Sequence, residues 1–148
     1  MASLIKTKNN IMIAPASDPI SEAELRLCAH TVALLGHDEK DDIHTSLGWV
    51  IRNRVTRNSM LMNDPRKISD ACEAVLREAL DKSDRIRAEE NLSEIDWSSV
   101  RAANYLVWKG KVMDQTHGAT SCHRHDKNPA WSRQRTPTAL LGAFLFFR

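Results

Sequence analysis

The residues whose types could do chemistry gather in the second half of the 148-residue chain. Three of the six histidines and one of the three cysteines fall there with two aspartates: Asp114, His117, Cys122, His123, His125 and Asp126. Thiolate, imidazole and carboxylate groups can all bind zinc, but a Cys-His-x-His run lacks the paired spacing of structural zinc sites. The spacing therefore predicts no metal, and these side chains are expected to line a polar groove for a ligand rich in hydroxyls and amides.

Two alternatives to the polar groove involve the same segment. A metal-binding interaction module built on Cys122, His123 and His125 stays open, and metal analysis would test it. A nucleophilic Cys122–His123 pair is disfavoured because adjacent residues on an extended chain point to opposite sides. No cofactor is expected.

Tryptophan offers a further kind of ligand contact, because its ring can stack on a sugar. The chain has four tryptophans: Trp49, Trp97, Trp108 and Trp131. Tryptophan at helical spacing is more often part of the core. Trp131 instead lies in a predicted loop beside Asn128-Pro129, so it is the best candidate for contact with a ligand.

About four helices are expected to position these residues, which makes the fold mainly α. A capping box from Ser21 to Glu24 predicts a helix that starts at Glu22 and carries an apolar stripe to Leu35. The same spacing predicts helices over 41–55, from 69 to 80, and from 96 to a stop at 110. Residues 81–94 are highly charged and are predicted as a solvated helix face or loop. The apolar segment 140–147 is predicted as a short strand or a buried extended tail.

The composition is that of one ordinary globular domain, with 42% hydrophobic and 27% charged residues. We expect an extended arm over residues 1–20, which either frays or docks on a partner, and a folded domain over 21–148. The net charge of +2 excludes nucleic-acid or membrane binding by charge alone. No signal peptide or membrane span is recognised, so synthesis in the cytoplasm is expected. Three cysteines favour reduced thiols, with Cys28 and Cys72 in the core.

A set of short motifs also runs through the chain in a fixed order. The first half holds Cys28-Ala29-His30-Thr31-Val32 and ends its second helix with Asn53-Arg54-Val55. The second half holds Asp114 to Gly118-Ala119-Thr120, His123, Asn128-Pro129-Ala130-Trp131, Thr138 to Gly142, and Phe146-Phe147-Arg148. These motifs resemble the SleB-type cell wall hydrolases, a family of spore-cortex-lytic and phage proteins, from about Glu24 to the final residue. The resemblance implies a lysozyme-like, mainly helical single domain.

The resemblance also implies a ligand and a site. The family cleaves the glycan strands of peptidoglycan with one glutamate as general acid and base, a role that requires a carboxyl group of raised pKa. The partner implied is therefore the peptidoglycan glycan strand. The substrate-binding positions implied are His117, Thr120, His123, Asn128 and Trp131.

The chain departs from the family at the catalytic position. Counting back without gaps from Asn53-Arg54-Val55, the expected glutamate falls on Leu35, and a leucine cannot transfer protons. Glu39 matches the second glutamate of the family motif and would replace the acid if the loop 36–40 turned it into the cleft. The alternative for Glu39 is a solvated loop carboxylate.

The sequence therefore predicts a peptidoglycan-directed domain of the cell wall hydrolase type that has lost or weakened cleavage. A phage or prophage origin is expected, with a structural role in the virion and the arm over residues 1–20 contacting other virion proteins. Such a protein would be virion-associated or released to the cell wall at lysis. The alternative is an active glycosidase or lytic transglycosylase that uses Glu39.

Overall fold

The computed structural model describes residues 20–62 and 68–148 of the chain. Its α-helices there are α1 (Glu22–Gly36), α2 (Asp41–Met62), α3 (Ile68–Ala79), α4 (Lys82–Glu90) and α5 (Trp97–Trp108). The strands are β1 (Ser121–Arg124), β2 (Ala139–Leu141) and β3 (Phe144–Phe147), and the short 3-10 turns are η2 (Leu92–Glu94) and η3 (Ala130–Ser132). The prediction of a mainly helical fold is confirmed.

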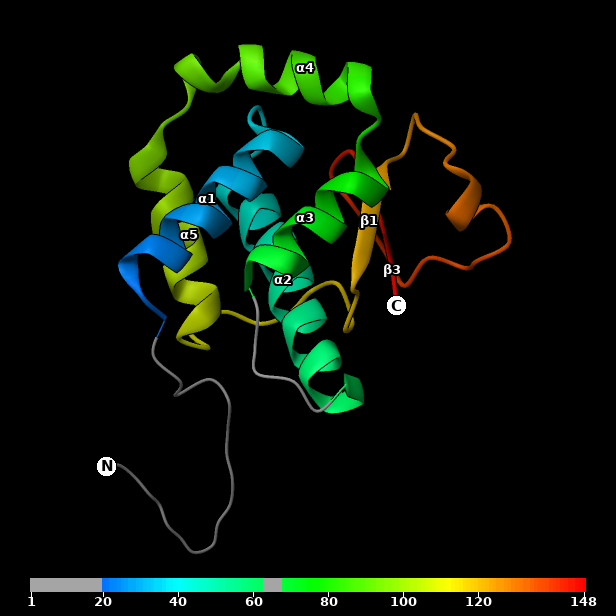
Figure 1. Ribbon diagram of the computed structural model, residues 1–148, viewed down its shortest axis with the longest axis horizontal. Coiled ribbons are helices and arrows are strands. Elements are labelled where there is room, and N and C mark those ends of the chain that lie inside the picture. Colours follow the sequence, from blue (N-terminus) through cyan, green and yellow to red (C-terminus); the bar gives the residue numbers. More distant parts are fainter. Residues whose placement is uncertain (1–19, 63–67) are drawn as a thin grey trace, which may run out of the picture.

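Helix α1 runs through the bundle and packs against α2, α3 and α5 (Figure 1). Its start is fixed by the predicted capping box, in which the Glu24 amide donates to the Ser21 hydroxyl at 3.1 Å and the Ser21 amide to the Glu24 carboxylate at 3.1 Å. The predicted apolar stripe is buried along its whole length: Leu25, Cys28, Val32 and Leu35. Hydrophobic burial on this stripe is what holds the helix in the centre of the fold.

The described residues form one helix more than the four that were predicted individually, because residues 82–90, in the charged segment predicted as a solvated helix face or loop, form helix α4. Asp81 caps it by accepting a hydrogen bond from the Asp84 amide at 2.8 Å. Only Ala88 of this helix is buried, so the segment carries no apolar stripe that periodicity could detect. The expectation of a solvated helix face is confirmed, and Figure 1 shows α4 at one end of the molecule, beyond the ends of the other helices.

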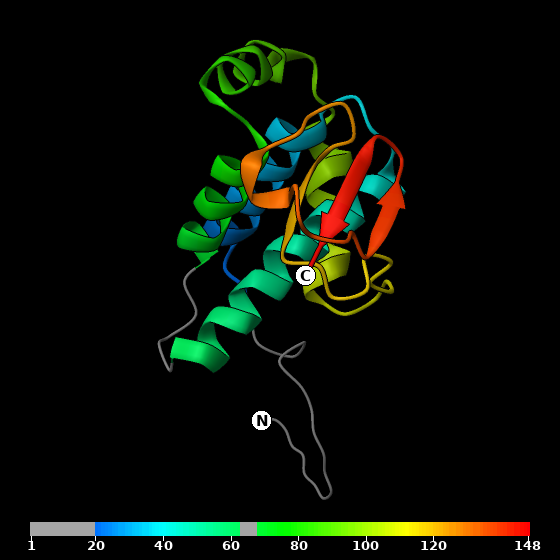
Figure 2. The same ribbon diagram turned by 90° about the vertical axis from the view of Figure 1, so that its right-hand side faces the viewer.

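A small antiparallel sheet with strand order β1-β3-β2 covers one side of the helices (Figure 2). The predicted single strand at the C-terminal end is in fact the hairpin β2–β3, which turns at Gly142 with φ of 56°. The sequence prediction missed β1, in which Cys122 pairs with Phe146 and His123 with Leu145. The buried side chains of Phe144 and Phe146 pack the sheet against the helical core.

Several other predictions concern the core and the ends of the chain. Cys28 and Cys72 are core residues as expected, and Cys122 is buried with them as a free thiol. The predicted arm lies outside the described residues except Ile20, which packs against the core. Within the described ranges, no helix combines the length and apolar character that crossing a bilayer requires.

Candidate ligand-binding groove

Two adjoining pockets form a groove where α3 meets α4 and the chain after β1 passes by. One pocket encloses about 310 Å³ and the other about 240 Å³, and they share four lining residues: Ala79, Leu80, Asp84 and Lys127. The first also contacts Glu78, Asn128 and Trp131, and the second Leu35, Arg87 and Arg124. We call the two pockets together the groove. The larger pocket alone reaches the lower end of the range for sites that hold small ligands.

Asp84 and Lys127 form an ion pair at the centre of the groove. The Lys127 ammonium donates to the Asp84 carboxylate at 3.1 Å, and Arg87 contacts the same oxygen from within α4. The Asp84 side chain is only 10% exposed, and this desolvation alone would raise its pKa. The hydrogen bonds and charges of Lys127 and Arg87 outweigh it and hold the pKa of Asp84 below its ordinary value. Asp84 is therefore ionised at neutral pH.

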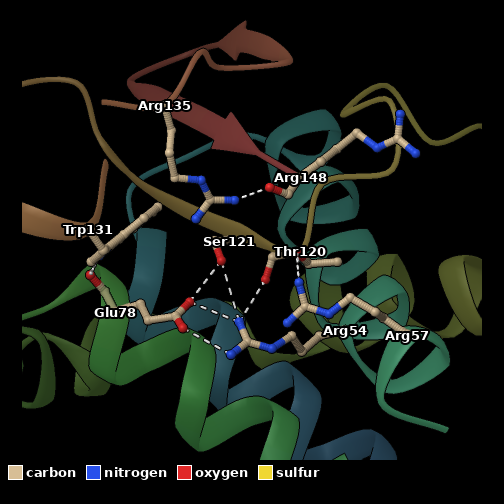
Figure 3. A network of polar contacts seen from close by, with 8 residues as sticks. All are labelled: Arg54, Arg57, Glu78, Thr120, Ser121, Trp131, Arg135 and Arg148. Carbon is tan, nitrogen blue, oxygen red and sulfur yellow. Dashed lines mark hydrogen bonds and ion pairs between the residues drawn. The ribbon is translucent and has the colours of Figure 1, made fainter. Parts of the chain in front are cut away.

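Glu78 lines the wall of the groove, and hydrogen bonds join it to residues behind that wall (Figure 3). Its carboxylate accepts two parallel hydrogen bonds from Arg54, each 2.9 Å long, and one of 2.8 Å from the Ser121 hydroxyl. Its main-chain carbonyl accepts a hydrogen bond of 2.8 Å from the Trp131 indole. Desolvation opposes ionisation of Glu78, but the Arg54 and Ser121 hydrogen bonds hold its pKa below the ordinary value.

Leu35, at the position that the resemblance gives to the catalytic acid, lies on the floor of the groove. Its side chain is 2% exposed and shares the smaller pocket with Leu34, Ala79 and Leu80. Glu39 is not among the described residues that line the two pockets. Its carboxylate lies 4.0 Å from the Arg124 guanidinium.

Of the predicted substrate-binding residues, Asn128 and Trp131 line the groove and the other three do not. His117 is exposed in a turn with φ of 57°. Thr120 is buried, and its hydroxyl accepts from Arg57 at 3.0 Å. His123 is buried, with its ring stacked on Phe147 at 5.3 Å between ring centres. His117, Thr120 and His123 are therefore not lining residues of the groove.

The predicted cluster of histidine, cysteine and aspartate is not a single site. Cys122 faces the core, and His125 and Asp126 are exposed beyond the end of β1. Over residues 20–62 and 68–148, no group of three or more His, Cys, Asp or Glu side chains is arranged to hold a metal ion. Cys122, His123 and His125 therefore do not form a metal-binding group in the described part of the chain.

Asp114 instead organises the turn that leads into β1. Its carboxylate accepts from the Asn53 amide at 2.9 Å, from the Thr116 main chain at 2.8 Å and from the Gly118 main chain at 3.0 Å. Burial alone would raise its pKa, but the hydrogen bond from the Thr116 hydroxyl at 2.6 Å and those from Asn53 and the main chain outweigh burial and hold the pKa of Asp114 below its ordinary value. Because Asn53 belongs to one motif and the turn to another, the two segments that carry the resemblance are bonded to each other.

Sequence reasoning missed Glu78 and Asp84. Glu78 follows the apolar stripe of α3, and Asp84 lies in the charged run, so neither stands out by type or spacing. The partners that give them a place in the groove are Arg54 and Lys127, which lie 24 and 43 residues away. Contacts between residues so far apart in the sequence can be found only once the fold is known.

Comparisons of the chain with protein-family models, with curated proteins and with solved structures gave no match, so the SleB-type resemblance stays a proposal.

Proposed function

We propose that this domain has a lysozyme-like fold, binds the glycan strands of peptidoglycan in the groove, and does not cleave them. The observation that carries the proposal is Leu35. It lies on the groove floor at the position where the family resemblance requires the proton donor, and its side chain is aliphatic.

The lining of the groove supports binding of a sugar chain. The Trp131 indole lines the groove and is held in a set orientation by its hydrogen bond to the Glu78 carbonyl. The exposed Asn128 amide and the Lys127 ammonium add donors beside it, and the amide oxygen also accepts. Hydroxyls and acetamido groups of a glycan are ligands of matching chemistry.

Two of the four carboxylates that line the groove, Glu78 and Asp84, support the absence of cleavage. Hydrolysis of a glycosidic bond needs a carboxylic acid that remains protonated near neutral pH, which requires a raised pKa. Glu78 and Asp84 are both paired with cations, and both have lowered pKa values. They hold the groove together and are poor proton donors.

A binding assay with purified sacculi tests the proposal. We expect the wild-type protein to sediment with sacculi and Asn128→Ala to bind several-fold more weakly, because a neutral hydrogen bond contributes about 1 kcal/mol. Gln134→Ala is the matched control, since Gln134 is also exposed and does not line the groove. Equal binding of the two variants would contradict the assignment of the groove.

An assay for release of soluble muropeptides from purified sacculi tests the second part of the proposal, the absence of cleavage. We expect none from the wild-type protein when products are separated by mass. Release that Glu39→Gln abolishes would instead establish the active enzyme and overturn the proposed loss of cleavage.

A further inference from the structure

Three arginine side chains converge beside the wall of the groove, where the chain enters β1 (Figure 3). Arg54 donates to the Thr120 main-chain carbonyl at 3.0 Å, and Arg57 donates to the Thr120 hydroxyl at 3.0 Å. The guanidinium of Arg135 lies over the ring of Trp131, 5.4 Å from its centre. Like charges are thus brought together next to two residues of the groove wall, Glu78 and Trp131.

The charges of the three arginines are not equally balanced. Arg54 is neutralised by Glu78, and Arg135 donates to the main-chain oxygen of Arg148. Arg57, within the residues described, contacts the Thr120 hydroxyl and no carboxylate. Desolvation and the neighbouring charge of Arg54 lower the pKa of Arg57; the Glu78 carboxylate offsets part of this effect, and Arg135 adds to it. An anion at this point would relieve that repulsion.

The geometry of Arg57 suits a carboxylate. A guanidinium has five N–H donors, and among the described residues only Nη1 of Arg57 has an acceptor. The side chain is half-buried, so part of it is open to solvent. Carboxylates bind guanidinium groups through such pairs of parallel bonds, as Glu78 binds Arg54 in the same cluster.

We propose that Arg57, flanked by Arg54 and Arg135, binds a carboxylate of the short peptide that branches from the peptidoglycan glycan strand. This inference rests on the proposed function and extends it from the glycan to its peptide. The groove adjoins the arginine cluster through Glu78, which binds Arg54, and through Trp131, over which Arg135 lies. The peptide carries free carboxylates, whereas the glycan without it offers far fewer.

Calorimetric titration with two ligands tests this assignment. One is a muropeptide that carries its peptide, and the other is a glycan fragment from which the peptide has been removed. We expect the wild-type protein to bind the muropeptide about tenfold more tightly, the value of one partly exposed charge-assisted hydrogen-bond pair. Arg57→Gln should abolish this difference and leave the affinity for the peptide-free glycan unchanged.

Two further variants separate charge from structure. Arg57→Lys keeps the charge and loses the parallel donors, so it should retain part of the preference for the muropeptide. Arg26→Gln, at an exposed arginine of α1 outside the groove and the arginine cluster, should retain all of it. The preference should also fall as ionic strength rises, because exposed charges are screened.

The outcomes are distinguishable. If Arg57→Gln leaves the preference for the muropeptide intact while both ligands bind, the carboxylate site is wrong and the proposed function stands. If Arg57→Gln weakens both ligands equally, Arg57 has a structural role and the site is also wrong. If neither ligand binds the wild-type protein, the proposed function fails and the carboxylate site fails with it.

Discussion

Replacement of Glu78 by glutamine should destabilise the fold through Arg54. Glutamine keeps one oxygen for Arg54 but places an NH2 group against the second guanidinium nitrogen, where the carboxylate now accepts at 2.9 Å. The variant thus loses one charge-assisted hydrogen bond and leaves Arg54, whose side chain is 12% exposed, without its counter-charge. Such a bond contributes about 1.5–3 kcal/mol. Breaking a fully buried pair costs roughly 3–5 kcal/mol.

Because the Glu78 side chain is 27% exposed, we expect a loss of about 2 kcal/mol in the free energy of unfolding for Glu78→Gln, below the range for a fully buried pair. Urea denaturation followed by circular dichroism measures it. The matched control is Glu73→Gln, which breaks the pair with Arg85 at 3.3 Å, where the Glu73 side chain is 55% exposed. Exposed pairs contribute about 0–1 kcal/mol. If Glu78→Gln costs no more than Glu73→Gln, the parallel bonds to Arg54 do not stabilise the fold and the reasoning is refuted.

Three more predictions concern stability. Glu78 and Asp84 have folded-state pKa values below their unfolded ones, so the unfolded chain binds more protons in acid; the stability they contribute should be present above the unfolded pKa and be lost as pH falls through the folded pKa, and Glu78→Gln should weaken that dependence in denaturation curves. Leu35→Glu buries a carboxyl group among aliphatic side chains and should cost about 3 kcal/mol or more. Because burial raises the pKa of this carboxyl group, the variant should lose stability as pH rises above the unfolded pKa of glutamate, about 4.3, and a variant equally stable at acidic and neutral pH would contradict this. Gly142→Ala adds a Cβ 2.9 Å from the Ile43 side chain at a φ of 56°, so the melting temperature should fall by several degrees for a loss of about 1 kcal/mol or more, whereas an unchanged melting temperature would mean that the hairpin turn relaxes freely.

The helices that bury one face could be predicted from the sequence, because the residues that are buried recur at helical spacing. In α1 both the capping box and the stripe from Leu25 to Leu35 predicted what the structure contains. Helix α4 could not be found this way, since it buries only Ala88. Strand β1 has four residues, three of them buried in succession, so it shows no alternation, and its partner β3 lies more than twenty residues further along.

The site followed the same division between local and distant signals. Trp131 was identified because a tryptophan in a loop is unusual for a core residue, Asn128 was predicted from the resemblance, and both line the groove. Thr120 and His123 were predicted as ligand contacts from the resemblance, but both are buried; the Thr120 hydroxyl accepts from Arg57, and Nδ1 of His123 contacts the Arg124 main-chain oxygen. A residue type cannot indicate whether its partner is a ligand or another part of the chain.

Helix α4 buries little apolar surface against the rest of the fold, and this affects how easily the helix unfolds locally. A helix with Ala88 as its one buried residue should unfold locally at a small fraction of the global free energy, so its amide hydrogens should exchange fastest among the helices. The Lys127–Asp84 pair is its bond across the groove. A ligand that contacts both α4 and the segment after β1 would slow that exchange, because it binds only the state in which α4 is folded and stabilises that state by mass action. Hydrogen exchange in α4 therefore provides a direct reporter of occupancy in the groove, independent of any chemical turnover.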